Sequence, residues 1–359
     1  MRLIIAGGGT GGHLFPGIAV AEEFLSRSPE NEVLFVGTER GIEARLLPKL
    51  GYKLELISAS GMKGMGTVKK LMSAVRLLYG YSQSRKILKE FSPDVVLGVG
   101  GYASAPILLA AKGMGIRRFI HEQNAFPGLT NKVLSRIVDG IFISMEEAAG
   151  FFPKGITQMT GNPIRKEILW GFQEQREREA GDAFRILVFG GSAGAQRINS
   201  AMLEALPFLE SAKSKLRITH QTGEKDVARV REGYQARGVQ AQVLSFIDNM
   251  SAAYGAADLV ICRAGATTIA EVTACGKGCV FIPYPYAADD HQRKNAESLV
   301  HKGAGRIIVE EDLTGERLAA EISDLMEHPE KVAELEKNAR SLAQLDAAQA
   351  IVAAMTGKG

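Results

Sequence analysis

In the stretch AGGGTGGHLFPG, residues 6–17, five glycines, a threonine and a histidine occupy positions 7–13, directly after a short apolar run. Glycine tolerates positive φ and close approach of other backbone, so a tight turn from strand to helix is one interpretation. The other is a phosphate cradle, because a helix N-terminus presents unpaired N–H groups and partial positive charge. A turn alone rarely needs so many glycines, and we therefore favour the cradle.

The same loop raises a rival function. Gly7, Gly9 and Gly12 fit the dinucleotide pattern G-x-G-x-x-G, which an acidic residue follows about 20 residues later. Glu39, just after the apolar run 33–36, could be that residue. An NAD-dependent oxidoreductase is therefore an alternative that the other motifs must decide.

Two further motifs of the first half stand at predicted strand ends. HEQN, at 121–124, places four polar side chains in a row, and a helix cap by Asn124 would explain only one of them. A carboxyl group at such a strand end suits acid/base chemistry or hydroxyl binding. GVGGY, at 98–102, is a second glycine-rich turn, explained equally by a diphosphate held between two loops or by close packing of a helix on a strand.

The second half carries CRAGATTIAE at 262–271 and FIPYPYAADDHQRKNA at 281–296. In the first, the start of a helix could hold phosphate, and Glu271 could accept hydrogen bonds from ribose hydroxyls. In the alternative, purely structural interpretation, Thr267 is the N-cap of the helix and the Glu271 side chain is solvated. In the second, amide and imidazole groups suit sugar hydroxyls. A metal on His291 and Asp290 lacks convergent ligands, so we expect none.

Composition limits the function classes. The 359 residues, 46% of them hydrophobic and 23% charged, indicate a folded chain of two domains. A net charge of +3 gives no reason to expect nucleic acid, and the three cysteines fit buried thiols in a reducing cytoplasm. No signal peptide or membrane-spanning run is visible, which counts against a periplasmic binding protein and limits any membrane contact to the surface.

Short apolar runs alternate with helical patterns, which predicts an α/β fold with parallel sheets. We expect strands at 2–6, 33–36, 95–99, 117–121, 140–143, 185–189, 216–220, 241–244, 258–261 and 279–282. The charged stretch 162–184 is the expected linker. Because ILVFGGSAGAQ at 186–196 loosely repeats the opening motif, we expect two similar lobes with ligands beyond the strand ends.

Taken together, the motifs resemble the MurG family of bacterial N-acetylglucosaminyltransferases over nearly the whole chain. They are, in order, GGTGGHLFPG, GVGGY, HEQN, GNPIR, GGSAGA, FIDNM, CRAGATTIAE and DHQRKNA. The resemblance implies the GT-B architecture: two Rossmann-like lobes with a cleft between them. The acceptor and membrane-facing lobe would be 1–162 and the donor lobe 163–340, with a C-terminal helix at 341–359 packing on the first lobe.

The resemblance also implies site residues. Ser192 would hold the donor phosphate, Arg165 the nucleotide part, the Ile247 backbone the uracil edge, and Glu271 the ribose. GlcNAc hydroxyls would be held by Gln292, with His291 and Asn295 nearby, and by Asn124 from the other lobe. The whole implied donor set is Thr10, Gly11, Gly12, Asn124, Arg165, Ser192, Ile247, Arg263, Ala266, Thr267, Thr268, Ile269, Ala270, Glu271, His291, Gln292 and Asn295. The implied acceptor set is Gly8, Gly9, Gly100, Gly101 and Tyr102.

The implied reaction is inverting transfer of GlcNAc from UDP-GlcNAc to the MurNAc 4-hydroxyl of lipid I, a polyprenyl-diphosphate-linked muropeptide, with no cofactor or essential metal. We expect His13 to be the general base, because an ordinary imidazole has a pKa of ~6.5 and can accept a proton near neutral pH. Glu122 is the alternative base, or the group that orients the base. Another UDP-sugar transferase of the same fold is the alternative enzyme. An oxidoreductase function would explain residues 7–12 but would give no role to HEQN, CRAGATTIAE and DHQRKNA.

A lipid-linked acceptor implies a peripheral protein on the cytoplasmic face of the inner membrane. The segment 67–90 is the expected contact with an anionic leaflet, although an ordinary core helix with a solvated basic side would explain it too. Its basic residues are Lys69, Lys70, Arg76, Arg85, Lys86 and Lys89, and its apolar stripe is Val68, Leu71, Met72, Val75 and Tyr79.

Overall fold

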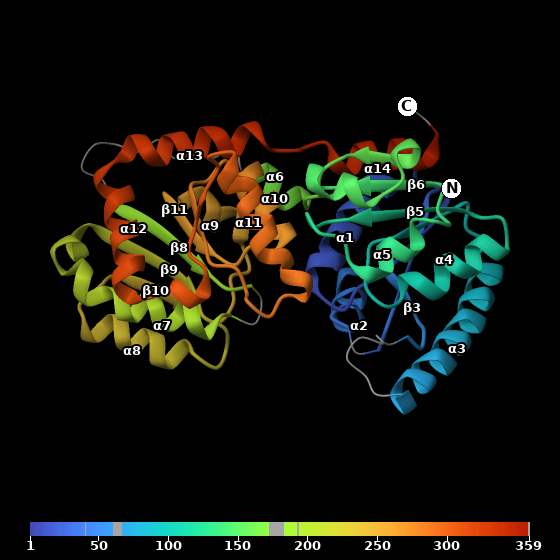
Figure 1. The fold of residues 1–359 in the computed structure, drawn as a ribbon, viewed down its shortest axis with the longest axis horizontal. Helices are drawn as coiled ribbons and strands as arrows, with labels where there is room; N and C mark the ends of the chain where they lie inside the picture. Colours follow the sequence, from blue (N-terminus) through green and yellow to red (C-terminus); the bar gives the residue numbers. More distant parts are fainter. Residues whose placement is uncertain (40, 60–66, 172–182, 192–193, 358–359) are drawn as a thin grey trace. The chain divides into compact units, whose positions relative to one another are not determined.

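Two structural units make up the chain. The computed structural model describes residues 1–39, 41–59, 67–171, 183–191 and 194–357, with 67–76 and 170–171 described by their backbone alone. Unit 1 is Met1–Arg165 with Gln344–Gly359, and unit 2 is Lys166–Ala343 (Figure 1). The boundaries expected after residues 162 and 340 each lie three residues before these.

Unit 1 is built on a parallel sheet of seven strands in the order β3-β2-β1-β4-β5-β6-β7. Its central strands are runs of Val, Ile, Leu and Phe buried on both faces, as parallel sheets require. The strands are β1 (Arg2–Ala6), β2 (Glu32–Gly37), β3 (Lys53–Leu56), β4 (Val95–Gly98), β5 (Arg117–Glu122), β6 (Gly140–Ile143) and β7 (Thr157–Met159).

Helices cover both faces of this sheet. Alternate residues of β1 face opposite ways: Leu3 and Ile5 join the core under α1 and α14, whereas Ile4 and Ala6 join the core on the other face, with α4. The helical elements are α1 (Gly11–Ser26), α2 (Glu43–Leu46), η1 (Pro48–Leu50), α3 (Thr67–Phe91), α4 (Ser104–Gly113), α5 (Leu129–Leu134), η2 (Glu146–Phe151), η3 (Lys154–Ile156) and α14 (Ala347–Thr356).

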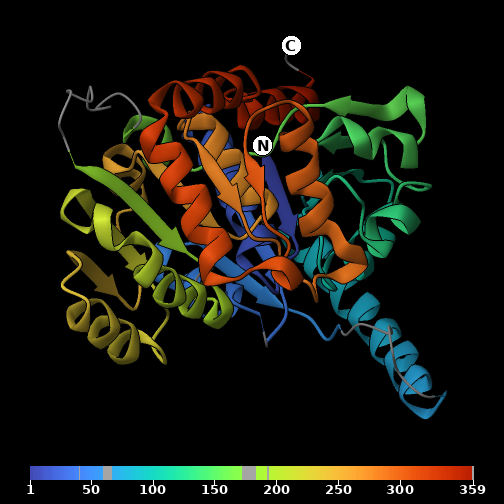
Figure 2. The same cartoon turned by 60° about the vertical axis from the view of Figure 1, so that its left-hand side comes forward.

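Two of these helices bear on function. The C-terminal α14 packs on α1 and buries Ile351, Val352 and Met355 in the core of unit 1. The long α3 packs on α4, and Figure 2 shows its amino-terminal part extending beyond the rest of unit 1. Along the described residues, no helix combines the length and the apolar character needed to span a bilayer.

Unit 2 repeats the plan with six parallel strands in the order β10-β9-β8-β11-β12-β13. They are β8 (Phe184–Phe189), β9 (Leu216–Gln221), β10 (Ala241–Leu244), β11 (Leu259–Cys262), β12 (Cys279–Phe281) and β13 (Arg306–Ile307). Its helical elements are α6 (Lys166–Gly171), α7 (Gln196–Ala205), η5 (Leu206–Lys215), α8 (Val227–Ala236), α9 (Met250–Ala256), α10 (Ala266–Ala274), η6 (Ala288–Asp290), α11 (His291–His301), η7 (Glu310–Asp312), α12 (Gly315–Glu327) and α13 (Pro329–Ser341).

The expected fold class, α/β with two Rossmann-like sheets, is confirmed. Each of the expected strands is present to within one residue at either end, but β3, β7 and β13 were missed. Within the expected linker 162–184, Lys166–Gly171 form α6, and Phe184 already begins β8.

Candidate functional site

The two glycine-rich loops of unit 1 lie against each other at the carboxyl ends of β1 and β4. A Cβ on Gly7, whose φ is +150°, would lie 2.4 Å from the carbonyl oxygen of Gly100. A Cβ on Gly101, whose φ is +80°, would lie 2.6 Å from the carbonyl oxygen of Gly8. Close backbone contact between the loops therefore explains several of the glycines in the opening motif.

An internal carboxylate occupies part of the expected cradle. Glu43, on α2, is buried, and its Oε2 accepts a 2.7 Å hydrogen bond from the backbone N–H of Gly9. Its Oε1 accepts from the backbone N–H and the hydroxyl of Thr38, at 2.9 and 3.2 Å. A Cβ on Gly8 would collide with the same carboxylate. The Gly9 N–H of the expected phosphate cradle therefore already has an acceptor inside the protein, whereas acceptor binding by Gly8 and Gly9 stays a prediction.

The start of α1 carries the expected base. Thr10 is the N-cap and is exposed, Gly11 and Gly12 form the first turn, and His13 follows half-buried. Its Nδ1 lies 3.0 Å from Oε1 of Gln123, and the described residues give its Nε2 no hydrogen-bond partner. The ring also lies against Gly100, where a Cβ would be 2.7 Å from Nδ1. His13 thus has one nitrogen held by the protein.

Glu122 is not placed as a general base. It is buried at the end of β5, and four donors surround its carboxylate. Oε1 accepts from the backbone and side-chain amides of Asn124, at 3.0 and 3.2 Å, and Oε2 from Gly128 N and Asn131 Nδ2, at 3.2 and 2.8 Å. Glu122 therefore fixes the turn into α5. Gln123, which the sequence reasoning did not select, is the residue that contacts His13.

Two further expected residues of unit 1 are Tyr102, which lies at the surface, and Arg165, which lies over an aromatic ring. Tyr102 is 58% exposed, so its ring is open to a ligand. The guanidinium of Arg165 stacks over the ring of Phe15, 4.5 Å from its centroid. Phe15 lies on α1, so Arg165 is held near the helix that carries His13.

The glycine-rich loop of unit 2 is tightly packed at the ends of β8 and β9. A Cβ on Gly194, whose φ is +75°, would lie 1.9 Å from Thr222 O. The buried Gln221 donates to Gly191 O at 2.7 Å and accepts from the backbone N–H of Ile247 at 3.2 Å. The backbone of Ile247 is expected to read uracil, and its N–H has this internal partner. Ser192, the expected phosphate ligand, lies outside the described residues.

Glu271 lies in the first turns of α10, behind the N-cap Gly265. It is 7% exposed, and its Oε2 accepts a 3.1 Å hydrogen bond from the hydroxyl of Tyr254. Burial raises the pKa of Tyr254 well above its usual value, so this hydroxyl stays a donor. The alternative of a Thr267 cap with a solvated Glu271 is therefore wrong. Of the rest of the expected stretch, Ala266 and Ile269 are buried, while Thr267, Thr268 and Ala270 are half-exposed.

The residues expected at the start of α11 have different surroundings. His291 and Gln292 are half-exposed, and Gln292 Oε1 accepts from Tyr284 N at 3.0 Å. The Nδ1 of His291 lies 2.7 Å from Ala288 O. Asn295 is 0% exposed and donates to Ala264 O at 3.2 Å. A direct contact between Asn295 and a sugar hydroxyl is therefore contradicted by its burial.

Arg263 also serves the protein itself. It is buried, donates to Ile282 O and Pro283 O at 3.1 and 2.9 Å, and pairs with Glu310 at 2.6 Å. These contacts of Nη1 hold the loop after β12, and the expected contact of Arg263 with the substrate stays a prediction.

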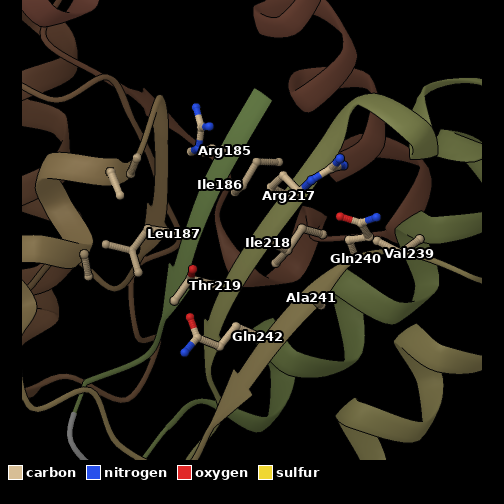
Figure 3. Close-up of a pocket in the computed structure, with 13 residues that line it drawn as sticks. Arg185, Ile186, Leu187, Arg217, Ile218, Thr219, Val239, Gln240, Ala241 and Gln242 are labelled. Carbon is tan, nitrogen blue, oxygen red and sulfur yellow. The ribbon is translucent and has the colours of Figure 1, made fainter. Parts of the chain in front are cut away.

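A pocket in unit 2 lies away from these loops. It opens against the amino-terminal halves of β8 and β9 and against α9, and it is lined by residues that include Arg185, Arg217, Thr219 and Gln242 (Figure 3). Ligands of parallel α/β sheets bind beyond the carboxyl ends of the strands. This general rule favours the loops at those ends over this pocket as the place for a ligand.

Family comparison defines the class of protein that this fold and site represent. The N-terminal domain of glycosyltransferase family 28 matches residues 3–143, and the C-terminal domain of the same family matches residues 185–351. The fold and the site are thus those of a two-domain glycosyltransferase of family 28.

Individual relatives narrow that class. A protein of Geobacter sp. (strain M21) is 86% identical over 100% of this chain and 96% of its own length, and one of Geobacter sulfurreducens is 62% identical over 98% and 97%. Both are named UDP-N-acetylglucosamine–N-acetylmuramyl-(pentapeptide) pyrophosphoryl-undecaprenol N-acetylglucosamine transferase. The crystal structure of Acinetobacter baumannii MurG superposes with a TM-score of 0.81 at 32% identity, over 99% of both chains. This chain belongs to the MurG family of glycosyltransferases.

Proposed function

We propose that this chain transfers GlcNAc from UDP-GlcNAc to the 4-hydroxyl of the MurNAc unit of lipid I, giving lipid II and UDP with inversion at the anomeric carbon. The names of relatives up to 86% identical support this substrate pair. The structural observation that carries the chemistry is His13, held at Nδ1 beside two glycine loops, with Nε2 left without a partner among the described residues. In a single displacement, Nε2 takes the proton of the acceptor hydroxyl while the oxygen forms the new bond and UDP leaves.

The donor's charges and hydroxyls have counterparts in unit 2. The N-terminus of α10 offers N–H groups and partial positive charge to a diphosphate. The Oε2 of Glu271 accepts from the Tyr254 hydroxyl, and we expect this carboxylate to accept from a ribose hydroxyl as well. Main-chain donors of this kind stabilise a leaving diphosphate, and we expect no essential metal.

We further propose that α3 meets the cytoplasmic leaflet that carries the lipid acceptor. Leu78 and Tyr79 are 71% and 60% exposed, and Arg85, Lys86 and Lys89 are exposed further along the same helix. Exposed apolar side chains in the middle of the helix, followed by exposed basic ones toward its carboxyl end, suit an anionic membrane surface. The side chains of Lys69, Lys70 and Arg76 lie outside the described ones.

One assay tests the proposal directly: release of UDP from UDP-GlcNAc, measured with and without a lipid I analogue. Release that depends on the acceptor supports the proposal. If protein that is folded by circular dichroism releases no UDP, either with or without the lipid I analogue, the proposal is refuted. Calorimetry with UDP and with NADH separates the transferase from the oxidoreductase, because only UDP should bind.

A further inference from the structure

A chain of buried polar groups runs from His13 into unit 1. Oε1 of Gln123 lies 3.0 Å from Nδ1 of His13, and Nε2 of Gln123 lies 3.1 Å from Nδ1 of His121. On its far side, Nε2 of His121 lies 3.2 Å from Gly161 O and 3.0 Å from the hydroxyl of Ser144. Gln123 and His121 are each 1% exposed, so water does not replace these partners.

The backbone decides which way the Gln123 amide points. Its Nε2 lies 2.9 Å from Val99 O and 3.3 Å from His121 O. Carbonyl oxygens only accept hydrogen bonds, so the NH₂ end must face them and the oxygen end must face His13. An oxygen cannot donate, and the proton in the contact between Gln123 and His13 therefore belongs to His13 Nδ1.

The second histidine agrees with this assignment. His121 Nδ1 faces the NH₂ group of Gln123 and must accept, which leaves its proton on Nε2, toward Gly161 O. Burial lowers the pKa of His121 to about 4, so the ring stays neutral and keeps this acceptor near neutral pH. Each hydrogen bond in the chain is therefore donated in the same direction, from His13 through Gln123 and His121 to Gly161 O.

We propose that Gln123 is a positioning residue that holds His13 in the Nδ1–H tautomer, with the lone pair of Nε2 directed at the acceptor hydroxyl. The importance of this tautomer for turnover rests on the proposed function, whereas the tautomer itself does not. An imidazole in water favours the opposite tautomer, which would place a proton where the base must accept one. Because the partner is a neutral amide, the tautomer is fixed without adding a negative charge beside the diphosphates of the substrates.

The first test is ¹⁵N NMR of the ligand-free full chain, labelled at histidine. The spectra are recorded at a pH well above the ordinary imidazole pKa of ~6.5. His13 is assigned by the signal lost in His13→Gln. We expect a protonated Nδ1 and an unprotonated Nε2. A protonated Nε2 in the unsubstituted protein overturns the proposal, and this measurement needs neither substrate nor turnover. A protein with the expected tautomer but no transferase activity would refute the proposed function alone.

Two substitutions separate orientation from packing. Gln123→Met and Gln123→Glu both lose the amide that donates to Val99 O, but only glutamate keeps an oxygen facing His13. We expect Gln123→Met to allow the Nε2–H tautomer of His13 and to lower kcat by roughly 10-fold to 10²-fold, with little change in the KM for UDP-GlcNAc. This loss is smaller than the ~10²–10⁴-fold expected when the base itself is removed. Glutamate should retain the Nδ1–H tautomer and recover most of kcat.

Ser144→Ala is the matched control, because Ser144 contacts His121 and not Gln123 or His13. It should leave the His13 tautomer unchanged. Equal losses of tautomer and kcat in the Met and Glu variants would show a packing role only and would overturn the proposal, as would a Met variant with the tautomer of the unsubstituted protein.

Discussion

The carboxylate of Glu43 lies 2.7 Å from the backbone nitrogen of Gly9, inside the loop whose composition suggested an anion-binding cradle. The loop does bind an anion, but the anion is part of the chain. Gly8, Gly37 and Gly41 all lie where a Cβ would collide with this carboxylate. Glycine at these positions therefore leaves room for the Glu43 side chain, whether or not a ligand also binds there.

Glu43→Ala should lower the free energy of unfolding by about 2–4 kcal/mol, because it leaves buried N–H groups of Gly9 and Thr38 without their acceptor. Urea unfolding measures the change. Glu39→Ala is the control, since Glu39 is exposed and its loss should stay within about 0.5 kcal/mol. Similar losses in the two variants would contradict the role given to Glu43.

His13→Ala should lower kcat by roughly 10²–10⁴-fold, the usual contribution of a general base. Glu122→Gln should mainly lower stability, because an amide cannot accept from all four donors around that carboxylate. Steady-state kinetics on folded protein distinguishes them. If His13→Ala turns over normally while Glu122→Gln does not, the two roles must be exchanged.

Glu271→Ala should raise the KM for UDP-GlcNAc roughly tenfold to hundredfold, since one or two charge-assisted hydrogen bonds of about 1.5–3 kcal/mol each are at stake. Tyr254→Phe removes only the hydroxyl that orients Glu271, so its effect on KM should be smaller. An unchanged KM in Glu271→Ala, with a normal circular dichroism spectrum, would remove Glu271 from the ribose site.

Acid should destabilise unit 2 through His220. Burial lowers the pKa of His220 from 6.5 to about 3, so the unfolded chain binds a proton that the folded chain refuses. Stability is therefore full above pH 6.5 and falls as the pH drops from 6.5 toward about 3. His220→Gln should flatten the fall in urea-unfolding free energy between pH 7 and pH 5. An equally steep fall in the variant would refute this origin.

The full chain should sediment with anionic vesicles and be released by high salt. Arg85→Glu with Lys86→Glu should weaken this binding roughly 10-fold or more without changing UDP binding, because each basic residue near the leaflet contributes about 1 kcal/mol. Arg237→Glu with Lys302→Glu, two exposed positions of unit 2, is the charge-matched control. Binding to neutral and anionic vesicles alike, or equal weakening by both pairs, would exclude α3 as the contact.

The strands that sequence alone predicts are the ones with continuous apolar runs. β3, β7 and β13 escape because they lie at sheet edges, are short and bury little: the residues of β3 are half-buried or exposed, and β13 has two residues. Their strand conformation comes from pairing with a neighbour distant in the chain, such as Leu34 with Lys53. A local pattern carries no sign of such pairing.

The candidate site, like the fold, can be predicted from the sequence only in part. Motifs predicted which loops gather at strand ends, but not which side chains hold them. Gln123 contacts His13 across 110 residues of sequence, and Glu43 contacts Gly9 across 34. Asn295 and Arg263 have residue types suited to a ligand, yet burial turns both toward backbone carbonyls. Polarity in a motif indicates hydrogen bonding without naming the partner.

The return of α14 to unit 1 bears on the order in which a growing chain gains its tertiary structure. Ile351, Val352 and Met355 complete a core whose other members include Leu3, Ile5 and Val33. Domains generally fold as they emerge during synthesis, the earlier one first. Here the sequence of unit 2 leaves the ribosome before the last helix of unit 1 exists. Unit 1, although made first, is therefore completed last. Until α14 has emerged, the apolar face of unit 1 beside α1 stays uncovered and can be bound by chaperones.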